Sequence, residues 1–101
     1  MTFEYLQHLV LKWAHDRKII EHSTSTAQLL KAVAEMGELA DAQAKGDAAG
    51  IIDGVGDVLV CLINFCAIHH IDIVGCLGSA YDEIKDRKGT MWPGGVFVKD
   101  E

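Results

Sequence analysis

The sequence has few of the residues that mark a disulfide scaffold, a zinc site or a glycine-rich phosphate loop. It contains one proline and three cysteines in 101 residues, and Cys61, Cys66 and Cys76 have neither zinc-type spacing nor the even number of a disulfide framework. We expect three reduced thiols buried in apolar helices. Dinucleotide-type and Walker-type loops are absent, so any phosphate would have to be held by side chains and metal ions.

Positive charge is also scarce: the chain has 9 Lys and Arg and 15 Asp and Glu, which give a net charge of −6. Nucleic-acid polymers and anionic membranes both require a basic surface, so neither is an expected partner. The N-terminus lacks the pattern of a signal peptide, and the apolar run 58–68 is shorter than the roughly 18 residues of a membrane span. These features predict a cytoplasmic protein.

Apolar residues recur at the three- and four-residue spacing of amphipathic helices along most of the chain. This spacing predicts four helices, over residues 2–18, 25–44, 47–70 and 72–88. The tail contains the only proline and a Gly-Gly pair, so it should turn and then run extended through residues 96–98. Short connections favour one all-α, four-helix bundle-like domain over residues 1–101.

Capping residues support the predicted helix ends. Ser25 followed by Gln28 fits a capping box, Gly46 is placed to end the second helix, and Asp47 and Asp72 fit N-caps. After Asp57 the third helix is apolar on nearly every side, which is typical of a buried helix. A domain of this size buries a limited share of its surface, so a second subunit is expected to complete the core.

Two acidic helix edges are the main candidates for chemistry. Glu35 and Glu38 lie three residues apart on the second predicted helix, and Asp53 and Asp57 lie four apart on the third. If the edges face each other, four carboxylates converge and require cations, and hard oxygen ligands suit Mg²⁺ or Mn²⁺. The alternative is that both edges are solvated helix faces. Asn64 follows on the apolar part of the third helix, which favours an inward-facing edge.

Other residue types give weaker signals. The five histidines have no spacing relation to the acids, and no Glu-x-x-His pair of a di-iron bundle occurs. Lys85, Arg87 and Lys88 could hold phosphates, but cations at a helix C-terminus are equally explained by the helix dipole. Trp13 could offer an aromatic surface to a base, although it is also a typical core residue at this spacing.

Four blocks of the sequence, taken in order, are similar to one protein family. KAVAEMGELADAQAKGD followed by DGVGDVLVCLINF resembles the signature EExxE and ExxD of the MazG-like all-α nucleoside triphosphate pyrophosphohydrolases. WAHDRKII resembles their first helix, and CLGSAYDEIKDRKGTMWPGGVFVK resembles the C-terminal end of short phage and prophage members. The resemblance covers nearly the whole chain and implies a MazG fold that is completed by pairing of subunits into a homodimer or tetramer.

The resemblance also implies roles for individual residues. By position, Glu35, Glu38 and Asp57 are expected to be catalytic and to bind metal, with Asp53 supplying a further ligand. The expected substrate contacts are Lys31, Arg87 and Lys88 for phosphates, Asn64 and Tyr81 for sugar or phosphate, and Trp13 for the base.

The implied activity is hydrolysis of (deoxy)nucleoside triphosphates to monophosphate and pyrophosphate, by attack of water at the α-phosphorus with Mg²⁺ or Mn²⁺ as cofactor. A purine substrate, particularly dGTP or GTP, is expected. Ala34 and Gly54 replace two glutamates of the family pattern. A nucleotide-binding or regulatory bundle without catalysis, and a structural scaffold, therefore remain as alternatives.

Overall fold

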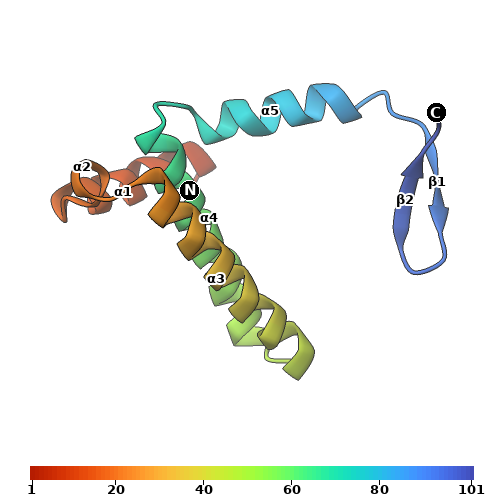
Figure 1. Cartoon of the computed structure of the whole chain (residues 1–101), viewed down its shortest axis with the longest axis horizontal. Coiled ribbons are helices and arrows are strands. Elements are labelled where there is room, and N and C mark those ends of the chain that lie inside the picture. The colour runs from red at the N-terminus through yellow and green to blue at the C-terminus, as the bar shows by residue number, and fades with distance from the viewer.

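A computed structural model describes all 101 residues. Its elements are α1 (Phe3–Asp16), α2 (Ile19–His22), α3 (Ser25–Lys45), α4 (Ala48–Ile68), α5 (Ile73–Ile84), β1 (Gly89–Trp92) and β2 (Val96–Lys99). Figure 1 shows α3 and α4 as a long antiparallel pair, with α1 and α2 across one end and α5 leaving as an arm that carries the β1–β2 hairpin. The predicted all-α fold class is confirmed.

Three helix ends form as the sequence predicts. Asp47 Oδ1 accepts a hydrogen bond from the Gly50 amide at 3.0 Å and begins α4, and Asp72 Oδ2 accepts from the Gly75 amide at 3.1 Å and begins α5. Gly46 ends α3 in the left-handed conformation with φ of 67°, which glycine adopts without strain. The tight connection between Gly46 and Asp47 is what folds α4 back along α3.

Three other boundaries are wrong. Thr24, and not Ser25, caps α3, since the Thr24 hydroxyl accepts a hydrogen bond from the helix at 3.0 Å and Ser25 is already helical. The first predicted helix stops at Asp16, because Lys18 adopts a left-handed φ of 62° before the chain resumes as α2. The last helix ends at Ile84, several residues earlier than predicted.

The C-terminal tail forms an antiparallel hairpin. The extended segment over 96–98 is confirmed as part of β2, but its pairing with residues 89–92 was not predicted. Gly94 and Gly95 make the turn with φ values of 93° and 85°. Met91 pairs with Phe97 and Trp92 with Val96, so both faces of the hairpin carry large apolar side chains.

The core lies along the α3–α4 pair, with α1 packed on α4. Only 10 of 101 residues are buried, which is a small core for a chain of this length. Cys61 and Cys66 are buried as predicted, and burial raises the pKa of both thiols. The expectation for Cys76 is wrong, because this residue lies on the exposed arm α5.

Helices α3 and α4 approach each other closely at Gly54. A Cβ atom placed on Gly54 would lie 3.0 Å from Leu39 Cβ and 3.2 Å from Leu39 Cα. Both distances are shorter than ordinary van der Waals contact, so a larger residue would push the helices apart. Gly54 therefore sets the spacing of the two helices that carry the acids.

By length and composition, α4 could cross a membrane. The helix has 21 residues, and the apolar run 58–68 is only its C-terminal half. This is weak evidence for a span, because a core helix of a soluble protein meets the same criteria.

The single chain leaves an excess of surface uncovered. Its accessible surface is 7553 Å². A compact monomer of 11.0 kDa exposes about 5,600 Å², so the excess is roughly 1,900 Å². Large apolar side chains on α1, α3, α5 and the hairpin contribute to it, among them Leu6, Leu30, Val33, Leu77, Tyr81 and Met91.

Candidate functional site

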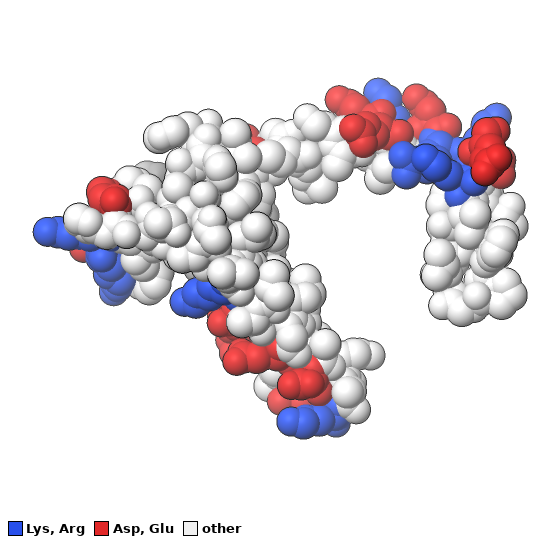
Figure 2. Space-filling view, in the orientation of Figure 1, with Lys and Arg blue, Asp and Glu red and all other residues white.

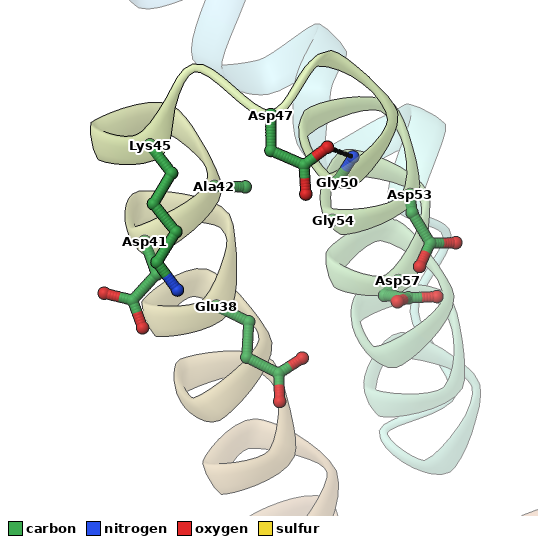
Figure 3. Close-up of a pocket in the computed structure, with 9 residues that line it drawn as sticks. All are labelled: Glu38, Asp41, Ala42, Lys45, Asp47, Gly50, Asp53, Gly54 and Asp57. Carbon is green, nitrogen blue, oxygen red and sulfur yellow. Dashed lines mark hydrogen bonds between the residues drawn. The ribbon is translucent and has the colours of Figure 1, made fainter.

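A cavity of about 280 Å³ lies between α3 and α4, close to the turn that joins them (Figure 3). Acidic side chains dominate its wall, and Lys45 is the single cation. The lining residues are Glu38, Asp41, Ala42, Lys45, Asp47, Gly50, Asp53, Gly54 and Asp57. A hollow with this lining attracts cations and, without them, repels anions.

Helical spacing and two glycines build this cavity. On α3, Glu38 and Asp41 lie three residues apart, and on α4, Asp53 and Asp57 lie four apart, so each pair shares a helix face. Figure 3 shows Glu38 on α3 and Asp57 on α4 on either side of the hollow. A Cβ atom on Gly50 would lie 2.6 Å from the Asp47 carboxylate, so glycine leaves this part of the wall open.

Glu35 extends the acidic wall one turn along α3. The side chain is half-buried, and the pKa of its carboxyl is raised first by burial and then by the negative charges of Glu38 and Asp57, against the opposing effect of Lys31. Lys31, Glu35 and Asp57 also act on the pKa of the buried Cys61 thiol. These shared effects place Lys31 and Glu35 beside the same stretch of α4 as Asp57.

The donor set fits a hard divalent cation. Burial raises the pKa of the Glu35 carboxyl, and the negative charges of Glu38 and Asp57 raise it further, so a cation nearby would offset the repulsion among these carboxylates. No three acidic side chains converge as a closed metal cage. Mg²⁺ commonly uses one or two carboxylates and completes its shell with water and substrate phosphates. This open arrangement therefore suits an ion that is shared with a phosphorylated ligand.

A second cavity of about 370 Å³ adjoins the acidic one. It is lined by Leu9, Val10, Trp13 and Val60 together with Asp57, which belongs to both cavities. Trp13 remains 44% exposed, so it is not fully packed as a core residue. Apolar walls with an aromatic ring beside a charged groove suit a flat, partly apolar group joined to an anionic one.

Asn64 lies further along α4, and its side chain is buried. Only 3% of the residue is exposed, and its Oδ1 atom has no hydrogen-bond partner. An unpaired buried acceptor is costly, so such an atom usually has a water or ligand partner. The inward orientation predicted for Asn64 is confirmed.

The structure brings together only part of the predicted set. Glu38, Asp53 and Asp57 line the acidic cavity, and Trp13 lines the neighbouring one. Three predicted substrate contacts fall on the arm instead: Tyr81 on α5, and Arg87 and Lys88 between α5 and β1. Figure 2 shows acids along the α3–α4 pair, and both acids and cations at the end of the arm.

Three polar residues that line the acidic cavity were not predicted from the sequence as site residues. Asp41 and Lys45 continue the stripe of Glu38 at spacings of three and four, so helical periodicity could have identified them. Asp47 was assigned to capping alone, and its position in the cavity depends on the tight turn before α4.

Together, the fold and the site define a class of all-α proteins with an acidic groove between two antiparallel helices and an apolar cavity beside it. A solved structure with a similar fold is the MazG-like pyrophosphohydrolase of cyanophage S-2L, bound to dGDP and three catalytic Mn²⁺ ions per active site. The two structures match with a TM-score of 0.74 at 19% sequence identity, over 100% of this chain and 95% of the cyanophage chain. The chain therefore has the MazG-like fold that its sequence resemblance implied.

Sequence comparison gives one relative of undescribed activity. The chain is 38% identical over 63 residues to an 18.2 kDa protein encoded in the rep-hol intergenic region of Haemophilus phage HP1. The match covers 62% of this chain and spans 39% of the length of the phage protein. No protein-family profile matches the sequence.

Proposed function

We propose that this protein hydrolyses (deoxy)nucleoside triphosphates to monophosphate and pyrophosphate with Mg²⁺ or Mn²⁺, as a phage-type MazG-like enzyme. The observation that carries the proposal is the acidic cavity between α3 and α4, which shares Asp57 with an apolar cavity. One cavity suits metal ions and phosphates, and the other suits a base. The cyanophage enzyme of the same fold, which binds dGDP and Mn²⁺, supports this reading.

The acids would act in two ways. Glu38, Asp53 and Asp57 would hold the cation, which when bound offsets the charge of the triphosphate and lowers the pKa of the attacking water. Glu35 has a raised pKa and is suited to orient that water and accept its proton. The water oxygen forms a bond to the α-phosphorus while the bond to the β-phosphate oxygen breaks, and pyrophosphate leaves.

The remaining contacts would fix the substrate. Lys31 beside Glu35 is placed to meet a phosphate, and the ring of Trp13 would contact the base in the adjoining cavity. Asn64 would use its unpaired amide oxygen for a hydrogen bond to the nucleoside, and Tyr81 would reach the sugar or phosphate only in an assembly. We rank dGTP and GTP ahead of the other common triphosphates.

The active form would be at least a homodimer, in the cytoplasm. The excess of roughly 1,900 Å² of surface exceeds the ~800 Å² per partner of a standard interface. Sedimentation at micromolar concentration should give a dimer or tetramer. A single 11.0 kDa species would contradict this assignment.

The decisive experiment is a pyrophosphate-release assay with the eight common (d)NTPs and either metal. Asp57→Asn and Glu38→Gln should each reduce turnover by roughly 100-fold or more, because each removes a carboxylate from the groove. Asp16→Asn is the matched control, since Asp16 is an exposed carboxylate that pairs with Lys12 at 2.8 Å outside the cavities. Wild-type rates in excess chelator would contradict a metal-dependent mechanism.

A binding or regulatory bundle without turnover is the second candidate. It is favoured by the absence of a closed carboxylate cage and by Ala34 and Gly54 at family acid positions. Nucleotide binding without pyrophosphate release, by a properly folded oligomer supplied with either metal, would favour it over the enzyme.

A further inference from the structure

The side chain of Arg17 holds the indole ring of Trp13. The Arg17 guanidinium lies over this ring, with its central carbon 4.6 Å from the ring centroid. Its Nη1 atom also donates a hydrogen bond at 3.2 Å to the backbone oxygen of Trp13. Because residues 13 and 17 are one helical turn apart, a single side chain makes both contacts. The other tryptophan, Trp92 on the hairpin, has no cation over its ring.

The end of α1 places Arg17 for these contacts. Arg17 is the C-cap residue of α1, and Lys18 follows it with a left-handed φ of 62°, which turns the chain away from the helix. A cation at a helix C-terminus commonly stabilises the last carbonyl groups, and the hydrogen bond to Trp13 has this effect. Capping explains the hydrogen bond, but it does not require the guanidinium to lie over the ring.

No carboxylate competes with the ring for Arg17. The two acids nearest to it in sequence have other partners: Asp16 pairs with Lys12 at 2.8 Å, and Glu21 accepts a hydrogen bond from the His15 ring at 2.6 Å. Lys12 lowers the pKa of the Asp16 carboxyl more than Arg17 does. Arg17 itself forms no ion pair. The guanidinium is therefore free to stay on the indole ring.

Another part of the Trp13 ring faces the apolar cavity beside the acidic site. The residue is 44% exposed, and it lines this cavity of about 370 Å³ together with aliphatic side chains of α1 and α4. Arg17 does not line the cavity, so the guanidinium and the cavity meet different parts of the ring. A flat group that enters the cavity can therefore stack on Trp13 without displacing Arg17.

A fixed ring binds a base better than a mobile one. An exposed side chain that is free to change rotamer has to be ordered when a ligand binds, and this ordering weakens binding. Contacts that hold the ring in the free protein remove most of this cost. Every nucleobase can stack on an aromatic ring, but a purine overlaps more of an indole than a pyrimidine does. Holding the ring should therefore favour purines over pyrimidines.

We propose that Arg17 is a positioning residue that holds the Trp13 ring as a platform on which a purine base of the substrate stacks. This inference rests on the proposed function and adds to it a determinant of base selectivity outside both cavities. Arg17 lines neither the acidic cavity nor the apolar one, so it should act on binding of the base and not on hydrolysis.

Arg17→Met tests the proposal, because methionine keeps an unbranched apolar side chain and removes the charge and the donors. The KM for dGTP should rise roughly 3- to 10-fold while kcat stays within about two-fold of wild type, since only ordering of the ring is lost. The KM for dCTP should rise less, so the ratio of kcat/KM for dGTP over dCTP should fall. Arg17→Lys should recover part of the loss, because an ammonium group can also lie over an indole ring.

Lys12→Met is the matched control on the same helix. It also replaces a cation by methionine, but Lys12 pairs with Asp16 and not with the ring, so the ratio of kcat/KM for dGTP over dCTP should stay at the wild-type value. All variants must first show wild-type helical content and sedimentation. A fall in kcat at unchanged KM, or equal losses for dGTP and dCTP in Arg17→Met, would overturn the proposal.

A second measurement needs no activity. In a Trp92→Phe background Trp13 is the single tryptophan of the chain, so its fluorescence reports on this ring alone. Arg17→Met should lower the fluorescence anisotropy of Trp13, whereas Lys12→Met should not. Quenching by dGMP with Mg²⁺, a ligand without a hydrolysable anhydride, should require roughly 3- to 10-fold more nucleotide in Arg17→Met.

The two measurements separate failure of the proposal from failure of the proposed function. If wild-type protein releases no pyrophosphate from any triphosphate, the proposed function fails, and the fluorescence of Trp13 still decides whether Arg17 holds a platform for a base. Unchanged anisotropy in Arg17→Met, or no quenching of Trp13 by dGMP in the parent protein, would overturn the role of Arg17.

Discussion

Replacement of Gly54 by alanine tests whether glycine sets the spacing of α3 and α4. In a helix interior this change alone would stabilise the protein by about 1 kcal/mol, because alanine has the higher helix propensity. The new Cβ, however, would lie 3.0 Å from Leu39 Cβ and 3.2 Å from Leu39 Cα. Overpacking of this kind costs about 1–3 kcal/mol, and backbone contact leaves little room for relief.

Gly56→Ala is the matched control on the same helix. A Cβ on Gly56 would meet no atom within 4 Å, so only the gain in helix propensity of about 1 kcal/mol is expected. The two variants should therefore differ by about 1–3 kcal/mol in the free energy of unfolding, with Gly54→Ala the less stable. Urea unfolding at one fixed protein concentration measures this difference, because association affects both variants alike.

The same comparison can be extended to activity. If Gly54 holds the two acidic edges together, Gly54→Ala should also lower turnover, while Gly56→Ala should leave it close to wild type. Equal stabilisation by both substitutions would refute the close approach at Gly54. It would also remove the structural reason for a glycine at this position.

Three further predictions concern metal, pH and substrate. Mg²⁺ or Mn²⁺ should raise the unfolding midpoint of wild-type protein more than that of Glu38→Gln, as seen by thermal unfolding with and without chelator; equal shifts would argue against ligation by Glu38. The pKa of the Asp72 carboxyl is lowered by the Gln7 side-chain amide and the Gly75 backbone amide. The charged carboxylate therefore stabilises the folded chain above its ordinary pKa of 3.8, and this stabilisation is lost as the pH falls through the lower pKa of the folded state. Asp72→Asn should accordingly lose more stability at pH 7 than near pH 3, and a pH-independent difference would contradict this. Values of kcat/KM should be highest for dGTP and GTP, whereas equal values for all eight (d)NTPs would refute base selectivity.

Local features of the fold could be predicted from the sequence because their causes are local. Asp47 and Asp72 cap their helices through amides three residues on, and Gly46 ends α3 through its own backbone freedom. The hairpin was only half predicted, because pairing of Met91 with Phe97 depends on register and not on periodicity.

The candidate site shows the same division. Helical spacing was sufficient to predict that Glu35 and Glu38 share one helix face and that Asp53 and Asp57 share another. Helical spacing could not predict that α3 and α4 approach each other closely at Gly54, since this approach depends on a contact with Leu39 on the other helix. Nor could it show that Arg87 lies on an arm remote from its own cavity, because the direction of α5 depends on the turn before it.

If the chain associates as proposed, the small number of buried residues would make its folding depend on protein concentration. With 10 buried residues, an isolated chain has little to offset its conformational entropy, so the proposed homodimer would supply most of its stability. Its unfolding midpoint should then rise with the total amount of protein, and chains present in few copies would be open to proteolysis. Abundance in the cell would thus control both the lifetime of the protein and the number of complete sites.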